Sequence, residues 1–397
     1  MDFLSQWLRE RLASGDYRRL FPIERSANGR IGTAEKPGSP ILDFSSNDYL
    51  ALSTHPAMIA AAEAALARYG TGVGAARLMS GDLMLFHQLE EAVAALKSRE
   101  AALVFGSGYM ANIGAIPALA GRGDVIFSDR LNHASIHDGC RLSGAKLVRF
   151  RHNDPDHLED CLKNKRGGNR GLIVVESLYS MDGDRCPLAD IVRLKNRHDC
   201  LLMVDEAHAT GIFGKKGGGL IQEEGFEDEV EIAMGTFGKG LGSYGAYIAG
   251  SETLKNYLIN RARTFIYSTG LPPAVIAASL KAVELLAGEP ERRKKLRDNA
   301  AYFKKALVAA GLPGEPGPSQ IVPVMVGDSR LAVKIAEELR ANSIFVTPVR
   351  PPTVPEGTAR LRFSVTLHQS RRELADTAAL LMEICNRLSA PISFPAE

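Results

Sequence analysis

A lysine, an aspartate and a histidine stand at spacings that suit one reaction centre. Asp205 ends the apolar run LLMVD, His208 follows three residues later, and Lys239 lies in the glycine-rich segment GTFGKGLG. A lysine amine can form a Schiff base with an aldehyde. A buried carboxylate beside a pyridine nitrogen keeps that nitrogen protonated, so that the ring accepts electron density from a carbanion. These residue types together point to pyridoxal phosphate (PLP).

The phosphate of such a cofactor needs an anion site, and one segment offers it. GSGYMA (106–111) follows the apolar run AALVF and opens a predicted helix. Glycines let the backbone approach an anion, and the start of a helix presents free N–H groups. Gly108 and Tyr109 supply these groups, and Thr236 adds a hydroxyl from the loop that carries Lys239. The segment also fits a loose NAD-binding fingerprint, which stays open as an alternative because any phosphate suits it.

The segment VDEAHATG (204–211) contains the letters DEAH, which are typical of a helicase motif. A helicase would also need a phosphate-binding loop of the pattern G-x-x-x-x-G-K-[ST]. The sequence around Lys239 does not fit this pattern, because position 233, where the first Gly would stand, is Ala, and position 240, where Ser or Thr would stand, is Gly. The helicase interpretation is therefore rejected.

Regular elements must position these residues. From about residue 45, short apolar runs rich in Val, Ile and Leu alternate with amphipathic stretches. This pattern predicts an α/β domain with a mostly parallel sheet covered by helices on both faces. We expect strands at 101–105, 124–127, 146–150, 172–176, 201–205 and 232–237. We expect helices near 83–97, 108–120, 133–142, 155–164 and 187–198.

Different patterns flank this region. Residues 1–14 predict an amphipathic helix, and a loop-like stretch rich in Gly, Pro and Ser follows. After about residue 288 a long charged helix leads into strands and a last helix at 370–388. We therefore expect an N-terminal helix and arm (1–44), a large PLP-binding domain (45–288) and a smaller C-terminal α+β domain (289–397).

Several longer motifs occur in a fixed order along nearly the whole chain. They include FSSNDYLALSTHP (44–56), SDRLNHASIHDG (128–139), VDEAHATGIFG (204–214), YSTGLPP (267–273) and RPPTVPEGTARLR (350–362). With these motifs the sequence resembles the α-oxoamine synthases, PLP enzymes of the aspartate-aminotransferase fold. The resemblance implies fold type I, with a seven-stranded, mostly parallel sheet in the large domain.

The resemblance also assigns roles around the cofactor. It implies that Lys239 forms the Schiff base, that Asp205 pairs with the pyridinium, that His208 bonds the phenolic oxygen, and that His133 stacks on the ring. These four are the expected catalytic residues. Further cofactor contacts are expected at Gly108, Tyr109, Ser180, Thr236, Ser268 and Thr269.

Ser268 and Thr269 resemble residues that reach the phosphate bound by the neighbouring subunit, which implies a homodimer with shared sites. Arg362 corresponds to the residue that pairs with the amino-acid carboxylate, a role that suits the guanidinium fork. Substrate contacts are also expected at Arg18, Asn47 and Thr353. Residues 74–75 lie in a segment that resembles the pocket for alanine or glycine.

The expected activity is a decarboxylative condensation of an amino acid with an acyl thioester. RPPTVPEGTARLR favours the branch that joins L-alanine to a pimeloyl thioester, carried on coenzyme A or on an acyl carrier protein. HASIHDG is closer to glycine C-acetyltransferase, so that activity, 5-aminolevulinate synthase and serine palmitoyltransferase remain alternatives. An aminotransferase of the same fold would share Lys239 and Asp205. A non-catalytic scaffold would lack Lys239 and is rejected.

Composition limits the other classes. The 397 residues are 45% hydrophobic and 24% charged, as in globular proteins. The 48 basic and 46 acidic residues give a net charge of +2, so no global field favours nucleic acid or an anionic membrane. No apolar run approaches the roughly 18 residues of a membrane span. Five scattered cysteines without a C-x-x-C motif argue against a disulfide framework or a zinc site and favour the cytoplasm.

Overall fold

The computed structural model describes residues 2–26, 28–33 and 36–395. The chain forms two compact units. The first comprises Met1–Ala51, Met181–Asp184 and Lys294–Glu397, and the second comprises Leu52–Ser180 and Arg185–Arg293. The boundaries predicted from the sequence, after residues 44 and 288, differ from these. The N-terminal arm belongs with the C-terminal residues because β3 (Lys36–Asp43) pairs in parallel with β12 (Ile344–Phe345).

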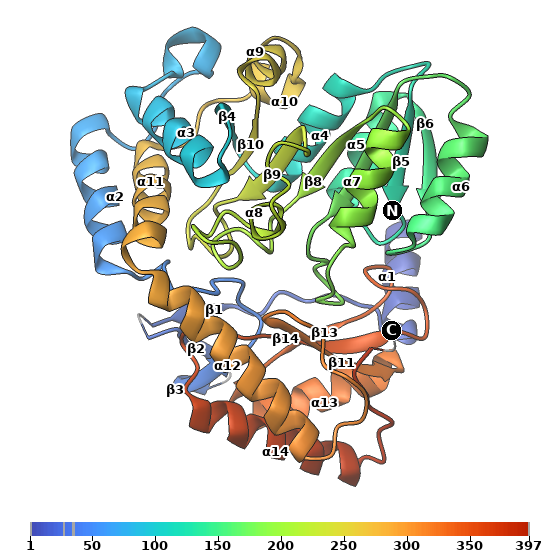
Figure 1. Cartoon of the computed structure of the whole chain (residues 1–397). Coiled ribbons are helices and arrows are strands. Elements are labelled where there is room, and N and C mark those ends of the chain that lie inside the picture. Colours follow the sequence, from blue (N-terminus) through green and yellow to red (C-terminus); the bar gives the residue numbers. More distant parts are fainter. Residues whose placement is uncertain (1, 27, 34–35, 396–397) are drawn as a thin grey trace. The chain divides into compact units, whose positions relative to one another are not determined.

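The second unit contains a seven-stranded sheet (Figure 1). Its strands, in spatial order, are β4 (Ala101–Phe105), β10 (Ala246–Gly250), β9 (Ile232–Thr236), β8 (Cys200–Asp205), β7 (Gly171–Glu176), β5 (Val125–Asp129) and β6 (Lys146–Phe150). Neighbours from β9 to β6 are parallel, and β10 runs antiparallel to both of its neighbours. The predicted mostly parallel α/β sheet is confirmed.

All six predicted strands are present, and β10 is the strand that the sequence did not reveal. β9 and β10 are joined by a loop (237–245) with no helix, so the chain turns back beside β9 and the pair is antiparallel. The run AYIAG lies between glycines at 245 and 250 and contains only one β-branched residue, so its strand signal was weak.

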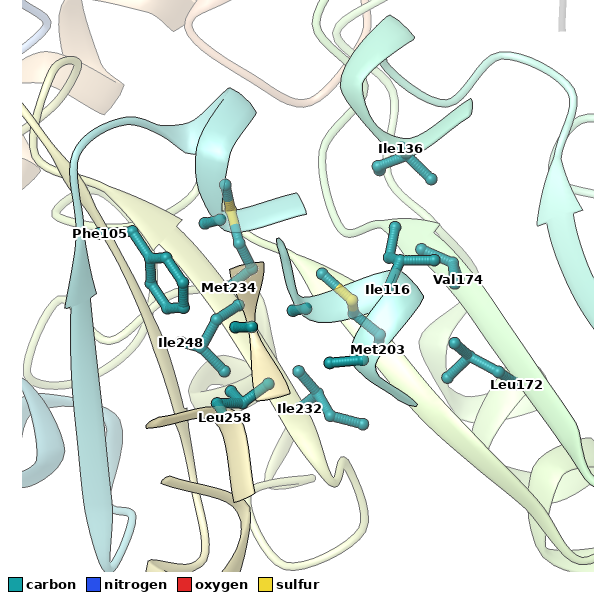
Figure 2. Close-up of a cluster of buried hydrophobic side chains, with 14 of the residues drawn as sticks. Phe105, Ile116, Ile136, Leu172, Val174, Met203, Ile232, Met234, Ile248 and Leu258 are labelled. Atoms are coloured by element: carbon teal, nitrogen blue, oxygen red, sulfur yellow. The ribbon is translucent and has the colours of Figure 1, made fainter. Parts of the chain in front are cut away.

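Helices cover both faces of this sheet. α4 (Gly108–Leu119) and α5 (Ala134–Ser143) connect strands in one direction across the sheet, whereas α6 (Pro155–Lys165) and α7 (Leu188–Arg197) connect them in the other. Right-handed crossovers therefore place the two pairs on opposite faces. Figure 2 shows the core on the α4–α5 face, where Ile116 and Ile136 lie near strand side chains.

Other helices complete the second unit. They are α2 (Pro56–Tyr69), the π-helical turn η1 (Arg77–Gly81), α3 (Met84–Lys97), α8 (Leu220–Glu224), α9 (Glu252–Arg261), α10 (Arg263–Ile266) and α11 (Pro273–Gly288). α9 and α10 contribute Leu258 and Phe265 to the same core, and Figure 2 labels Leu258. No helix in the described part of the chain is long and apolar enough to cross a membrane.

The first unit has two smaller sheets. One has the order β1 (Ile23–Arg25), β2 (Arg30–Thr33), β3, β12, and the other has β11 (Ile321–Gly327), β14 (Ala359–Ser364), β13 (Thr347–Val349). The helices are α1 (Asp2–Ser14), α12 (Pro290–Ala309), α13 (Ser329–Ala341) and α14 (Arg371–Arg387). α14 begins with a capping box between Ser370 and Glu373. α1 is helical as predicted, but its apolar side chains, among them Trp7, are exposed.

A buried ion pair stabilises the loop that follows β8. The Lys97 ammonium contacts the Glu206 carboxylate and the carbonyl of Gly218, and both charged side chains are buried. Glu206 also accepts a hydrogen bond from the backbone N–H of Ile221 at 2.9 Å. Burial by itself lowers the pKa of Lys97, but the negative charge of Glu206 raises it above its usual value. Lys97 therefore stays charged, and its contact with Glu206 fixes the residue next to Asp205.

Removing one member of this pair should destabilise the protein strongly. Lys97→Met leaves the Glu206 carboxylate buried without its cation, so the free energy of unfolding should fall by about 3–5 kcal/mol in denaturant titration. Lys294→Met, in an exposed pair with Asp298, is the control and should change it by about 0.5 kcal/mol or less. Equal effects of the two substitutions would contradict this account of the buried pair.

Candidate active site

Three acidic side chains lie at the carboxyl ends of neighbouring parallel strands. Asp129 ends β5, Glu176 ends β7 and Asp205 ends β8, and all three are buried. Glu176 and Asp205 occupy directly paired positions in the register of β7 and β8. The carboxyl ends of parallel strands are where open α/β sheets bind their ligands. This edge of the sheet is therefore the candidate site.

Hydrogen bonds fix both oxygens of the Asp205 carboxylate. The backbone N–H of Ala207 donates to Oδ1 at 2.9 Å, and Nδ2 of Asn112 donates to Oδ2 at 3.0 Å. Asp205 is only 5% exposed, so these protein donors, rather than bulk water, fix its carboxylate. A carboxylate has about four acceptor positions, and these two bonds leave capacity for a further N–H donor.

Lys239 and His208 are in contact. Nζ of Lys239 lies 2.8 Å from Nε2 of His208, as the shared reaction centre predicted from the sequence requires. Lys239 lies in the loop after β9, and His208 lies in the loop after β8. The two loops approach closely because residue 240 is glycine: a Cβ there would lie 2.7 Å from the carbonyl oxygen of Thr210.

The start of α4 has the features of a phosphate site. Ser107 caps the helix, and its Oγ accepts the N–H of Met110 at 3.2 Å. Helix geometry leaves the N–H groups of Gly108 and Tyr109 without an intrahelical acceptor. A Cβ on Gly108 would lie 3.0 Å from Cε of Met234 and 4.0 Å from Cβ of Thr236. A side chain at residue 108 would therefore press on Met234, and the helix start lies beside Thr236.

The hydroxyl groups of Thr236 and Tyr109, beside this helix start, both form hydrogen bonds within the protein. Oγ1 of Thr236 donates to the carbonyl of Gly245 at 2.7 Å and accepts the N–H of Gly238 at 3.1 Å. The hydroxyl of Tyr109 donates to the Asp138 carboxylate, and this bond raises the pKa of Tyr109. The backbone of Tyr109, rather than its hydroxyl, is thus the group available to a phosphate.

His133 caps α5 with its own side chain. Nδ1 accepts the backbone N–H of Ser135 at 3.2 Å, and Ser135 Oγ lies 2.7 Å from the same nitrogen. Desolvation lowers the pKa of His133, with opposing effects from Asp205, which raises it, and Lys239, which lowers it. His133 is thus within electrostatic range of both Asp205 and Lys239.

Glu176 is a site residue that the sequence analysis did not identify. Oε1 of Glu176 accepts the backbone N–H of His133 at 2.5 Å, and the side chain is 3% exposed. Burial, followed by the negative charge of Asp205, raises the pKa of Glu176 well above its usual value of 4.5. One sequence signal could have revealed it: the apolar run LIVVE ends in an acidic residue, as the run LLMVD does at Asp205.

The other expected cofactor residues also lie in the second unit. Ser180 is buried in the loop after β7. Ser268 and Thr269 lie between α10 and α11, and Thr269 forms an isolated antiparallel bridge with Ala76. The carbonyl of Ala75 accepts the N–H of Gly270 at 3.1 Å, so the segment predicted as the alanine or glycine pocket is attached to this loop.

The expected substrate residues lie in the first unit, where Arg362 and Asn47 are in contact. Arg362 donates from Nη1 to Oδ1 of Asn47 at 3.2 Å and to Oγ of Ser364 at 2.8 Å, and from Nη2 to the hydroxyl of Tyr49 at 3.2 Å. Desolvation raises the pKa of Tyr49, partly offset by Arg362, so this phenol stays neutral. These neutral oxygens orient the guanidinium fork, which suits bidentate binding of a carboxylate.

Arg18 and Thr353 are also brought together. Nη2 of Arg18 donates to Oγ1 of Thr353 at 2.9 Å. Both residues line a cavity of about 830 Å³ in the first unit, which is in the size range of sites for drug-sized ligands. Its lining includes Arg19, Arg330 and Arg340 together with apolar side chains, so it suits an elongated ligand with anionic and apolar parts.

The residues of the second unit fit PLP. Lys239 offers an amine to an aldehyde, Asp205 offers a fixed carboxylate to a pyridinium, and His208 adjoins the amine. The glycine at 108 leaves a cradle at the start of α4 that a Cβ would fill. A phosphorylated pyridine aldehyde requires N–H groups for its phosphate and a carboxylate for its pyridinium. Both lie on the same edge of the sheet, at the start of α4 and at Asp205.

Replacing Glu176 should change how stability depends on pH. The pKa of Glu176 is higher in the folded protein than in the unfolded chain, so its contribution to stability is complete below its ordinary pKa and is lost as pH rises through the folded-state value. Glu176→Gln keeps the acceptor oxygen for His133 and cannot ionise. Its free energy of unfolding should exceed that of the wild type at about pH 8, and the difference should shrink toward about pH 5.

Urea titrations at the two pH values measure this difference. Glu91→Gln, on the exposed side of α3, serves as the control and should follow the wild type at both pH values. A Glu176→Gln variant that is less stable than the wild type by the same amount at both pH values would show that Glu176 is ionised in the folded protein.

Known proteins similar to this chain agree with the geometry. The chain matches the family model described as aminotransferase class I and II over residues 39–377. It is 46% identical to the 8-amino-7-oxononanoate synthase of Citrifermentans bemidjiense, over 98% of this chain and 99% of that protein. It is 46% identical to the enzyme of the same name from Geobacter sulfurreducens, over 96% and 97% of the two chains.

Solved structures give the same result. Serine palmitoyltransferase from S. paucimobilis, solved with a bound PLP–myriocin aldimine, superposes with a TM-score of 0.92 at 29% identity, covering 98% of both chains. The 8-amino-7-oxononanoate synthase of Francisella tularensis superposes with a TM-score of 0.76 at 29% identity, covering 88% of this chain and 99% of that one. The chain therefore depends on PLP and belongs to the aminotransferase class I and II family, in its α-oxoamine synthase branch.

Proposed function

We propose that this enzyme joins L-alanine to a pimeloyl thioester and releases CO2 and the thiol, so that it makes 8-amino-7-oxononanoate for biotin biosynthesis. The observation that carries the proposal is the contact of Lys239 with His208, beside the fixed carboxylate of Asp205. The relatives that are 46% identical over nearly the whole chain bear the name of this synthase and support the choice of substrates.

When bound, PLP supplies an electron sink for the pair of electrons left at the alanine Cα. The protein's own residues then have separate tasks. Lys239 holds the cofactor aldehyde and, as a free amine, removes the Cα proton of L-alanine. Asp205 holds a proton at the pyridine nitrogen. His208, 2.8 Å from the Lys239 amine, bonds the cofactor's phenolic oxygen.

Phosphate and ring contacts position the cofactor for this work. The N–H groups at the start of α4, from Gly108 and Tyr109, bind the phosphate together with the hydroxyl of Thr236. Ser180 adds a further contact, and His133 covers one face of the ring. The α4 start is suited to this task because its free N–H groups and the helix dipole both favour an anion.

Substrates are bound by residues of the first unit. Arg362 binds the carboxylate of L-alanine, and Asn47, which accepts from Arg362 at 3.2 Å, orients the guanidinium. Arg18 and Thr353 contact the acyl donor at the cavity that they line. Coenzyme A and an acyl carrier protein both present the thioester on an elongated arm, so the proposal holds for either donor.

We further propose a homodimer in which Ser268 and Thr269 reach the phosphate bound by the partner. Large side chains of the second unit near these residues are exposed, which suits an interface with a second copy. Tyr267 is 70% exposed and Met79 is 79% exposed. We also propose a cytoplasmic location, supported by five scattered cysteines that form no C-x-x-C motif.

A glycine-using synthase is the second candidate, because the motif HASIHDG favours it. Its chemistry would use Lys239 and Asp205 in the same roles. The two candidates differ in the amino acid, so the response of the bound cofactor to L-alanine and to glycine separates them.

The visible spectrum of the purified enzyme tests the proposal. Addition of PLP should give an absorbance band of the lysine-bound cofactor, and L-alanine should perturb it at lower concentration than glycine. Lys239→Ala should lose this band and all measurable turnover while it still binds some PLP, because the amine is both the attachment point and the base.

A stronger response to glycine would favour the glycine-using candidate. Conversion of the cofactor to its amine form would indicate an aminotransferase. Turnover near the wild-type rate by Lys239→Ala would contradict the assignment of this lysine.

Arg362 should act on L-alanine specifically. Arg362→Gln removes a charge-assisted bond to the carboxylate, worth about 1.5–3 kcal/mol, so the KM for L-alanine should rise about 10- to 100-fold. The KM for the thioester should change little. Steady-state kinetics with each substrate varied in turn measures the two values.

Arg360→Gln is the matched control, because Arg360 lies on the same strand and contacts the Asp182 carboxylate. It should lower the free energy of unfolding and leave the KM for L-alanine close to the wild-type value. The role of Arg362 is refuted if both variants raise the KM for L-alanine equally.

A further inference from the structure

A chain of hydrogen bonds connects Asp205 to His133. Nδ2 of Asn112, on α4, lies 3.0 Å from Oδ2 of Asp205 and 2.9 Å from Oγ of Ser135. Ser135 Oγ lies 2.7 Å from Nδ1 of His133. Asn112 and Ser135 are each 1% exposed, so bulk water does not interrupt the chain. Neither residue was identified from the sequence.

The donors and acceptors give each bond in this chain a direction. The Asp205 carboxylate already accepts the N–H of Ala207 at Oδ1, so it presents an acceptor to Asn112. The Asn112 amide nitrogen carries two N–H donors, one for Asp205 and one for Ser135 Oγ. The reverse orientation of the amide would set its carbonyl oxygen against the carboxylate and is unfavourable.

The direction of the remaining bond follows. The backbone N–H of Ser135 donates to Nδ1 of His133 at 3.2 Å, so this nitrogen is an acceptor. The Ser135 hydroxyl, whose oxygen accepts from Asn112, therefore donates its O–H to the same nitrogen at 2.7 Å. A ring nitrogen that receives two donors has no room for a proton of its own, so the neutral ring carries its proton on Nε2.

We propose that Asn112 and Ser135 are positioning residues that link Asp205 to His133 and hold the His133 ring as the Nε2–H tautomer. The fixed Nδ1 cap sets the orientation of the ring, and Nε2–H becomes its single N–H donor. For the role of that donor at the cofactor, the inference rests on the proposed function. The tautomer itself is a property of this chain's own residues.

The charges around His133 are compatible with a neutral ring. Asp205 on β8, Glu176 on β7, Lys239 after β9 and Asp138 on α5 face it. Desolvation is the largest effect and lowers the pKa of His133; Asp205 and Asp138 raise it, and Lys239 lowers it. Protonation of Nδ1 would also break the cap of α5. The hydroxyl of Ser135 adds to this preference because it stabilises the unprotonated Nδ1.

Nitrogen-15 NMR of the histidine-labelled enzyme tests the proposal without relying on turnover. Spectra of the PLP-loaded and cofactor-free forms, with His133→Gln to identify the signals, should show an unprotonated Nδ1 and a protonated Nε2 at neutral pH. Ser135→Ala removes the hydroxyl donor, so the midpoint of the His133 titration should rise by about 0.5–1 pH unit. Ser135→Thr keeps a hydroxyl and should restore the wild-type midpoint.

Ser128→Ala is the matched control. Ser128 is buried and accepts from the amide of Asn132 at 2.9 Å, as Ser135 accepts from Asn112, but within the described part of the chain its hydroxyl does not bond to His133. Its His133 titration should equal that of the wild type. A proton on Nδ1 at neutral pH, or equal midpoints for Ser135→Ala and Ser128→Ala, would overturn the proposal.

The link to Asp205 has its own test. Asn112→Leu should raise the His133 midpoint as Ser135→Ala does, and should shift the pH dependence of the visible band of the bound cofactor. A visible band whose pH dependence equals that of the wild type would remove Asn112 from the chain. If the wild-type protein shows the expected tautomer but does not condense L-alanine with a pimeloyl thioester, the proposed function is wrong and the tautomer proposal stands.

Discussion

Two carboxyl groups, those of Glu176 and Asp205, occupy paired positions at the ends of neighbouring parallel strands, and both are buried. Two negative charges on neighbouring buried side chains repel each other strongly, because little water is present to screen them. This repulsion favours a proton on one of the two groups. The environment selects Glu176, whose pKa is raised well above its usual value. Asp205 instead receives N–H donors at both oxygens. The parallel register thus places a carboxyl group with a raised pKa beside the Asp205 side chain, whose oxygens are held by N–H donors and suit a pyridinium partner.

The remaining polar groups of this sheet edge follow from that arrangement. The neutral Glu176 accepts the backbone N–H of His133 and so places the first turn of α5. Asn112 and Ser135 connect the same histidine to Asp205 from the side of α4. Behind them, the buried Lys97–Glu206 pair fixes the residue that follows Asp205. The hydrogen bonds and the ion pair named here are buried, and a buried network of this kind is rigid because every broken bond leaves an unsatisfied group.

The sequence predicted the parts of this structure that depend on local pattern. Apolar runs gave the six strands from β4 to β9, and the positions of Asp205 and Lys239 relative to those runs gave the cofactor. Contacts between distant segments were not predictable: Asn112 and Asp205 are 93 residues apart, and nothing near Asn112 marks it as polar core. The same holds for β3 and β12, whose pairing joins the N-terminal arm to the C-terminal residues and moves the domain boundary. Glu176 was missed because a strand-ending acid is common on a surface, and its burial is a tertiary property.

Two arginines on β14 show how surroundings, rather than residue type, set a role. Arg360 and Arg362 are two positions apart, so their side chains leave the same face of the strand. Arg360 contacts the Asp182 carboxylate, so its positive charge is neutralised within the protein. Arg362 is oriented by the neutral oxygens of Asn47, Ser364 and Tyr49. Burial keeps the Tyr49 phenol neutral, so ionisation of this ring does not add a competing anion. A guanidinium that is held in place by dipoles retains its strongest attraction for an incoming carboxylate.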